Sequence, residues 1–139
     1  MVTTAIEAAK DWLKSAELNL NAGMPAQSLY SLEMAVEIAF KAVLISLDIE
    51  VPKVHDIEKT IRAHIAVDGR MPKWFLDELE DYLSTFGTLL ELRMPAGYVF
   101  EQGFKKEGIE QEAKMLIPKC RKILQSCEKV VKAIDKVMK

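Results

Sequence analysis

Two residues of opposite charge, Glu37 and Lys41, lie one helical turn apart in an otherwise apolar stretch. Between residues 27 and 47 the only other charged residue is Glu33. Positions i and i+4 share one face of a helix, and a glutamate that precedes a lysine by four residues forms a favourable ion pair. Tyr30 and Glu33 join that face, so the spacing predicts a narrow polar stripe on an apolar helix.

Two interpretations of this stripe are open. Periodicity alone favours an exposed edge of a helical bundle, where an ion pair contributes only a few tenths of a kcal/mol. In the alternative the stripe is buried. A buried charge costs several kcal/mol unless it is paired, so burial would indicate a specific role for Glu33, Glu37 and Lys41.

The elements that must position these residues are helices, and no stretch of the sequence predicts a strand. Five helices are expected, at about residues 3–21, 25–47, 55–67, 72–92 and 109–138. Pro95 and Gly97 should end the fourth helix, which leaves residues 93–108 as the longest irregular segment. Pro118 should bend the fifth helix or mark its effective start. The fifth helix carries a heptad-like apolar seam that suits either a bundle partner or a second chain.

Composition predicts one globular domain over residues 1–139, with half of the residues hydrophobic and 29% charged. The net charge of −2 excludes the global basic field of most duplex-binding proteins. No apolar run reaches the roughly 18–20 residues of a membrane span, and the N-terminus lacks the pattern of a signal peptide. We therefore expect a cytoplasmic protein with no membrane contact. Cys120 and Cys127 would lie about 10 Å apart along a helix, so we expect reduced, buried thiols.

The stretch from Glu33 to Leu44 resembles the second-helix signature of HEPN domains (higher eukaryotes and prokaryotes nucleotide-binding). That signature reads roughly Gln-Gln-Ala-Ala-Glu-Lys-Ala-Leu-Lys-Ala-Leu-Leu, and Glu33 and Met34 replace its paired glutamines. Trp12-Leu13 is similar to the family's first helix. Pro52 and His55-Asp56-Ile57 resemble the Pro-x-x-His-Asp-Leu that opens the third helix. The direct matches to the signature are Ala35, Glu37, Ala39, Lys41, Ala42 and Leu44.

The resemblance implies that His55 is a structural residue at the start of a helix. At that position we expect a neutral imidazole that forms hydrogen bonds. His64 is interpreted as a surface or interface residue. Catalytic HEPN proteins are metal-independent ribonucleases with an Arg-x(4–6)-His motif at the end of the fourth helix, where two subunits meet. Arginine binds the phosphate and histidine moves a proton. Arg93 stands at the matching place, but no histidine follows it.

Tyr98 stands where that histidine could fall. A phenol is a poor general base at neutral pH, because it ionises near pH 10. Tyr98 could still bind a phosphate or stack on a base. Arg93 itself has a second interpretation, as a helix C-terminal cation that the helix dipole favours.

The resemblance, which covers about residues 9–95, implies an all-α, antiparallel up-and-down bundle of four to five helices that forms a homodimer. It implies a nucleotide- or RNA-binding module that acts with a minimal nucleotidyltransferase as a toxin–antitoxin-like pair. The alternatives are an atypical metal-independent ribonuclease, with Arg93 as its candidate catalytic residue, and a structural, partner-holding dimer. No metal or cofactor is expected, because the Glu-x-x-His pattern of di-iron bundles and the Walker motif are both absent. The expected binding residues are Glu33, Glu37, Lys41, Arg93 and Tyr98.

Overall fold

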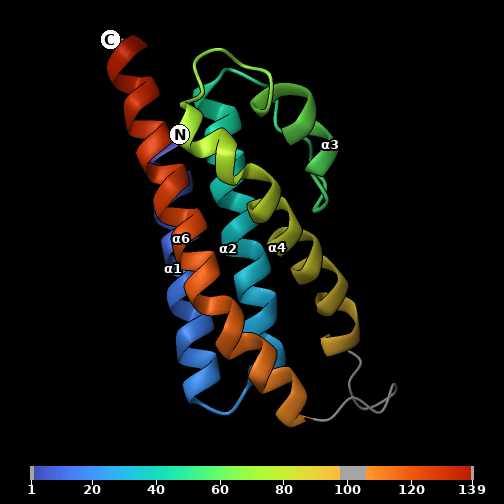
Figure 1. The fold of residues 1–139 in the computed structure, drawn as a ribbon. Helices are drawn as coiled ribbons and strands as arrows, with labels where there is room; N and C mark the ends of the chain where they lie inside the picture. The colour runs from blue at the N-terminus through green and yellow to red at the C-terminus, as the bar shows by residue number, and fades with distance from the viewer. Residues whose placement is uncertain (1, 98–105, 139) are drawn as a thin grey trace.

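The computed structural model describes the backbone of residues 2–97 and 106–138, and the side chains of residues 2–93 and 107–135. These residues form helices and no strand, which confirms the all-α bundle. In Figure 1, α1, α2 and α6 lie side by side, and α4 lies on the opposite side of α2 from α1. The elements are α1 (Val2–Asn21), α2 (Pro25–Ser46), α3 (Glu58–Thr60), the π-helical η1 (Ile61–Ile65), α4 (Lys73–Gly97) and α6 (Lys106–Met138).

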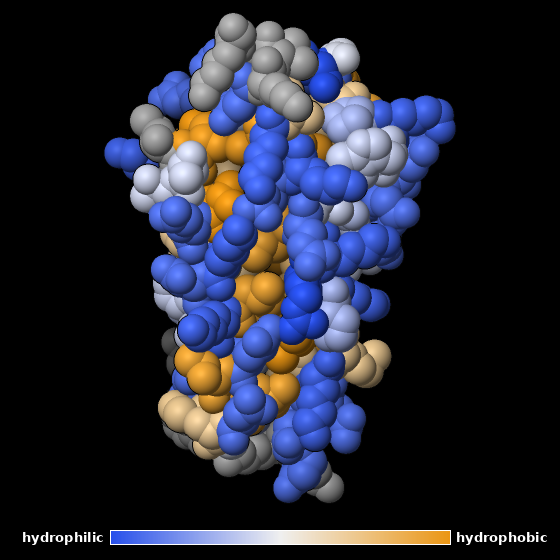
Figure 2. Space-filling view, turned by 90° about the vertical axis from the view of Figure 1, so that its left-hand side faces the viewer, coloured by the Kyte–Doolittle hydropathy of each residue, from blue (hydrophilic) through white to orange (hydrophobic). Residues whose placement is uncertain are grey.

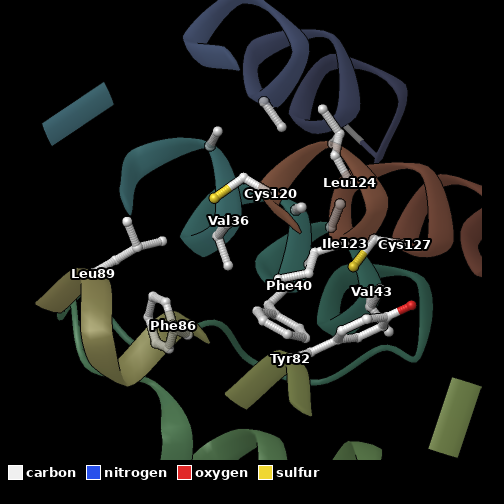
Figure 3. Packing of buried hydrophobic residues seen from close by; sticks show 14 of the residues in the cluster. Val36, Phe40, Val43, Tyr82, Phe86, Leu89, Cys120, Ile123, Leu124 and Cys127 are labelled. Carbon is white, nitrogen blue, oxygen red and sulfur yellow. The ribbon is translucent and has the colours of Figure 1, made fainter. Parts of the chain in front are cut away.

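The central element is α2, which contacts α1, α4, α6 and η1. A helix that is apolar almost all round can only be stable when other elements cover every face. Phe40 is fully buried and meets Phe86 of α4 edge to face, with ring centroids 6.0 Å apart. Figure 3 shows these two rings next to Tyr82, with Cys120, Ile123 and Cys127 of α6 pointing toward α2.

Small side chains let α1 and α2 approach each other closely. Ala9 and Ala16 of α1 are completely buried, and the Ser28 hydroxyl donates a 2.8 Å hydrogen bond to the Ala16 carbonyl. The turn between the helices needs Gly23, whose φ of 77° lies in the left-handed region. The Gly23 and Met24 N–H groups bond back to the carbonyls of Leu20 and Asn19, which ends α1 in a Schellman motif.

Residues on one face of α6 complete the core. Cys120 and Cys127 are free and buried, as expected, and burial raises the pKa of the Cys120 thiol to about 12. Figure 2 shows the side formed by α1 and α6, where hydrophobic residues appear between rows of hydrophilic ones. The α6 residues that join the core are Ile109, Ala113, Leu116, Ile117, Cys120, Ile123, Leu124, Cys127, Val130, Val131 and Ile134.

Three predicted boundaries are wrong. The third helix was expected from His55, but α3 begins at Glu58 and leaves His55 in the preceding loop. The fourth helix continues through Pro95 to Gly97, because a proline in the last turn removes only one intrahelical hydrogen bond. The fifth helix was expected from about residue 109 but begins at Lys106. It includes Pro118 in its interior, so of the two expectations for this proline the effective helix start is wrong. Residues 93–97 and 106–108, which were expected to be irregular, are therefore helical.

No helix in the described parts of the chain is both long enough and apolar enough to cross a bilayer.

Candidate functional site

Six polar residues from α2, α4 and the loop after α2 meet at one place, which we call the polar cluster. Helical spacing puts the α2 members on one face. After α2 the chain reverses at Asp48, whose φ is 61°, and Lys41 Nζ donates a 3.0 Å hydrogen bond to the Val54 carbonyl. This bond holds the returning loop against α2. The members of the polar cluster are Tyr30, Glu33, Glu37 and Lys41 of α2, His55 of the loop and Arg93 of α4.

The two glutamates of the cluster are buried. Glu33 is 0% exposed and Glu37 is 2% exposed, so the interpretation of this stripe as an exposed edge is wrong. The carboxylates are paired: Glu37 Oε2 lies 2.8 Å from Lys41 Nζ, and Glu33 Oε2 lies 3.3 Å from Arg93 Nη1. Periodicity could not predict this burial, because the covering elements are α4 and the loop, which come later in the chain.

His55 links the two halves of the cluster. Its Nδ1 lies 2.8 Å from Glu37 Oε1, and its Nε2 lies 3.4 Å from Arg93 Nη2. A carboxylate accepts and a guanidinium donates, so both contacts are satisfied when the neutral ring carries its proton on Nδ1. The lone pair is then on Nε2. The side chain of His55 is 53% exposed, so solvent reaches the ring.

The pKa values of the two neighbouring carboxyls, Glu33 and Glu37, are shifted in opposite directions. Burial, followed by the hydrogen bond and the negative charge of Glu37, raises the pKa of Glu33 to about 8, although the charges of Arg93 and Lys41 oppose this rise. Burial also opposes ionisation of Glu37, but hydrogen bonds with Glu33, Lys41 and His55 outweigh it and lower the Glu37 pKa. Glu33 Oε1 is buried and meets no hydrogen-bond donor. The two carboxyls are therefore more stable with one proton between them than with both ionised.

Because its pKa is raised, Glu33 offsets the positive charge of Arg93 less than a fully ionised carboxylate would near neutral pH. Lys41 matches the ionised Glu37, whereas the carboxyl that faces Arg93 is largely neutral below a pKa of about 8. The Arg93 guanidinium lies 4.7 Å from the centre of the Tyr30 ring, and its side chain is 24% exposed. The open edge of the cluster is thus suited to an anion.

The same residues could offer ligands to a metal ion. Glu33, Glu37 and His55 each present one ligand atom, and these atoms lie within 4.8 Å of one another. Arg93 and Lys41 already contact the two carboxyls. A cation would therefore add charge to a site whose two cations already exceed its ionised carboxylates, and it would have to displace the proton of Glu33. The arrangement fits an anion better than a metal.

Among protein families, the HEPN domain matches residues 2–130. The chain belongs to the HEPN domain family. Membership places it, in general terms, among nucleotide- or RNA-related modules. Comparison with curated proteins and comparison with solved structures give no match. The polar cluster of this HEPN domain contains the Glu-x-x-x-Lys pair of the second helix and the histidine of the Pro-x-x-His-Asp pattern.

The structure brings together Glu33, Glu37, Lys41 and Arg93 of the expected binding residues, and Tyr98 lies outside the described residues. His55, which was expected to be structural, was not among the predicted site residues. Its place in the Pro-x-x-His-Asp pattern was the signal that could have identified it. Tyr30 was assigned to the stripe but not to the site.

Proposed function

We propose that this HEPN domain binds a nucleotide or RNA through a phosphate group held by Arg93. The observation that carries the proposal is the position of Arg93: its side chain is 24% exposed at the open edge of the cluster, beside the Tyr30 ring and 3.3 Å from Glu33, a carboxyl whose pKa burial raises to about 8. Guanidinium groups bind phosphate oxygens through two parallel hydrogen bonds. A phosphate at the open edge of the cluster would supply the counter-charge that Glu33 does not.

Tyr30 provides a second contact in this proposal. Tyr30 is 39% exposed, and its ring lies under the Arg93 guanidinium and meets Trp12 edge to face at 5.8 Å. Single-stranded RNA is commonly bound by stacking unpaired bases on aromatic rings next to a phosphate-binding arginine. Tyr30 is therefore positioned to contact the base that adjoins the bound phosphate.

The proposal is tested by measuring the binding of a fluorescent single-stranded RNA oligonucleotide at several salt concentrations. We expect Arg93→Ala to weaken binding about 10- to 100-fold, because a charge-assisted hydrogen bond contributes about 1.5–3 kcal/mol. The slope of log affinity against log salt should fall by about 0.7 for the lost phosphate contact.

Arg62→Ala is the matched control, because Arg62 is a surface arginine already paired with Glu58 and Glu80. Its substitution should leave binding unchanged. If Arg62→Ala and Arg93→Ala weaken binding equally, or if the wild-type protein binds neither RNA nor nucleotides, the proposed site is wrong. In the second case the protein would be a structural, partner-holding bundle.

We further propose that the protein forms a homodimer and acts with a minimal nucleotidyltransferase in a toxin–antitoxin-like pair. The support is the family, whose small members commonly work in this way. The homodimer is tested by equilibrium sedimentation, where we expect twice the chain mass of 15.7 kDa, and a mass of one chain would overturn it. The pair is tested by co-purification with a nucleotidyltransferase encoded beside this chain, and the toxin by growth arrest when this chain is expressed alone.

A further inference from the structure

We propose that the buried carboxylate of Glu33 competes with a bound phosphate for Arg93, so that phosphate binding requires Glu33 to take up a proton. The inference rests on the proposed function, because the phosphate must bind at Arg93 for the competition to exist. It adds regulation to that function. Glu33 is 0% exposed and lies behind the site, yet its ionisation controls how tightly Arg93 binds an anion.

The competition follows from the contacts of Glu33. Among the described residues its one ion-pair partner is Arg93, whose Nη1 lies 3.3 Å from Glu33 Oε2. The second carboxyl oxygen, Oε1, is buried and meets no hydrogen-bond donor in that part of the chain. The Arg93 side chain is 24% exposed, so one guanidinium faces both the buried carboxyl and the open edge. A phosphate at that edge would draw the guanidinium away from Glu33.

No other cation of the polar cluster is placed to replace Arg93 beside Glu33. Lys41 Nζ lies 2.8 Å from Glu37 Oε2 and also donates to a backbone carbonyl of the loop. The two ring nitrogens of His55 lie against Glu37 and Arg93. The titratable and charged groups that surround Glu33 are Tyr30, Glu37 and Lys41 of α2, His55 of the loop and Arg93 of α4.

A buried carboxylate that loses its cation becomes neutral by taking up a proton. The charge of Glu37, one helical turn away, adds to the cost of a second ionised carboxyl beside Lys41. Glu33 must therefore be protonated once a phosphate holds Arg93. The coupling is reciprocal, so protonation of Glu33 strengthens phosphate binding as much as the phosphate raises the proton affinity of Glu33.

The coupling determines the direction of the pH effect. In the free protein the pKa of Glu33 is about 8, so below this pH the carboxyl is already largely protonated and binding takes up little. Above it, each phosphate that binds brings a proton into the site, and the affinity falls by up to about tenfold per pH unit. Between pH 7 and pH 9 the wild-type protein should lose about tenfold in affinity.

The test measures binding at both pH values with a fluorescent oligocytidylate that has 2′-O-methyl riboses and no terminal phosphate. The charge of this probe does not change over the range, and the methyl groups prevent alkaline hydrolysis. Glu33→Gln has a side chain of the same size that cannot ionise. At pH 7 it should bind within about threefold of wild type, since a threefold change is below the loss of one hydrogen bond. It should keep that affinity at pH 9.

Glu80→Gln is the matched control, because Glu80 also pairs with an arginine but does so on the exposed surface, where Arg62 lowers its pKa. This variant should retain the tenfold loss of the wild type. Titration of His55 is common to all three proteins and cancels when they are compared. Circular dichroism checks that each variant is folded.

Calorimetry of the wild-type protein measures the proton directly and needs no variant. Titrations in buffers of different ionisation enthalpy give the number of protons taken up with each bound oligonucleotide. At pH 8.5 we expect an uptake of about three-quarters of a proton, because that fraction of Glu33 is ionised before binding. Proton release, or no proton transfer, would overturn the competition.

The two proposals fail in different ways. Wild-type protein that binds equally tightly at pH 7 and pH 9 would overturn the role of Glu33 and leave the binding site at Arg93 intact. The same conclusion would follow if Glu33→Gln lost as much affinity as wild type. Wild-type protein that binds the oligonucleotide at neither pH would overturn the binding site and the competition together.

Discussion

Glu33 and Glu37 are chemically identical and one turn apart on α2, yet their environments separate their pKa values. Glu37 has Lys41 and His55 as partners, whereas Glu33 has Arg93 at a longer distance and the charge of Glu37 beside it. Two carboxyls this close in a buried site ionise with difficulty, so one retains a proton. Because Glu33 retains the proton, Arg93, and not Lys41, is the cation that is available to bind a ligand.

A pH-dependent stability follows from the retained proton. The pKa of Glu33 is 4.5 in an unfolded chain and about 8 in the fold. The folded state therefore binds more protons between these values, and stability falls as the pH rises through this window. Glu33→Gln mimics the neutral carboxyl and removes the titration. We expect the free energy of unfolding of Glu33→Gln, relative to wild type, to rise from pH 5 to about pH 8 and to level off above it in urea titrations.

Glu107→Gln is the control for this measurement, because Glu107 is exposed near the start of α6. The difference in the free energy of unfolding between Glu107→Gln and wild type should not change with pH over the same range. A flat or falling difference for Glu33→Gln would show that Glu33 is ionised in the fold. The lowered pKa of Glu37 acts in a separate window, below pH 4.5, where acid removes the stability that its ion pair provides.

At the scale of elements, α4 must be held in place for Arg93 to reach α2. The contacts of α4 with α6 include a buried hydrogen bond, in which the Tyr82 and Ser126 hydroxyls lie 2.7 Å apart. Phe86 packs on Phe40 farther along α4. These contacts align the helix so that Arg93, close to its C-terminal end, meets Glu33 and His55.

The Tyr82–Ser126 bond makes a measurable link between the two helices. Tyr82→Phe and Ser126→Ala should each lower the free energy of unfolding by about 1–3 kcal/mol, because each leaves a buried hydroxyl unpaired. The double variant should lose less than the sum, with a coupling of about 0.5–1.5 kcal/mol in urea denaturation. Strictly additive losses would mean that the two hydroxyls do not bond in solution.

At the scale of the molecule, α2 forms the core that all other elements share. Phe40 is 0% exposed and lies where α2 faces α4. A cavity at this position should weaken the whole domain, because α1, α4, α6 and η1 all pack against α2.

Phe40→Ala should lower the free energy of unfolding by about 3–5 kcal/mol, a large share of the ~5–15 kcal/mol typical of a domain. Leu18→Ala, at a residue that is 60% exposed, should change it by less than about 0.5 kcal/mol. Trp12 lies in α1 and Trp74 in α4, and both of these helices pack against α2. Fluorescence and circular dichroism should therefore give one transition, and two separate midpoints would contradict a shared core.

The sequence predicted the helices, most of their boundaries and the apolar faces, because each depends on periodicity within a single segment. Ile57, Ile61 and Ile65, which are spaced four residues apart in the sequence, are all buried. The boundaries that failed, at Glu58, Gly97 and Lys106, depend on whether packing with distant parts of the chain extends or delays a helix end. The family was identified from motifs, and its match to residues 2–130 confirms it.

Only the tertiary structure decided that the polar stripe is buried and that His55 joins it. Glu33 and Arg93 are separated by 60 positions, and His55 and Arg93 by 38. Contacts at such separations leave no local pattern in the chain. They arise here because Asp48 turns the loop back along α2 and because α4 covers the same face of α2. The fold therefore places the imidazole of His55 beside Arg93, although no histidine follows Arg93 in the sequence.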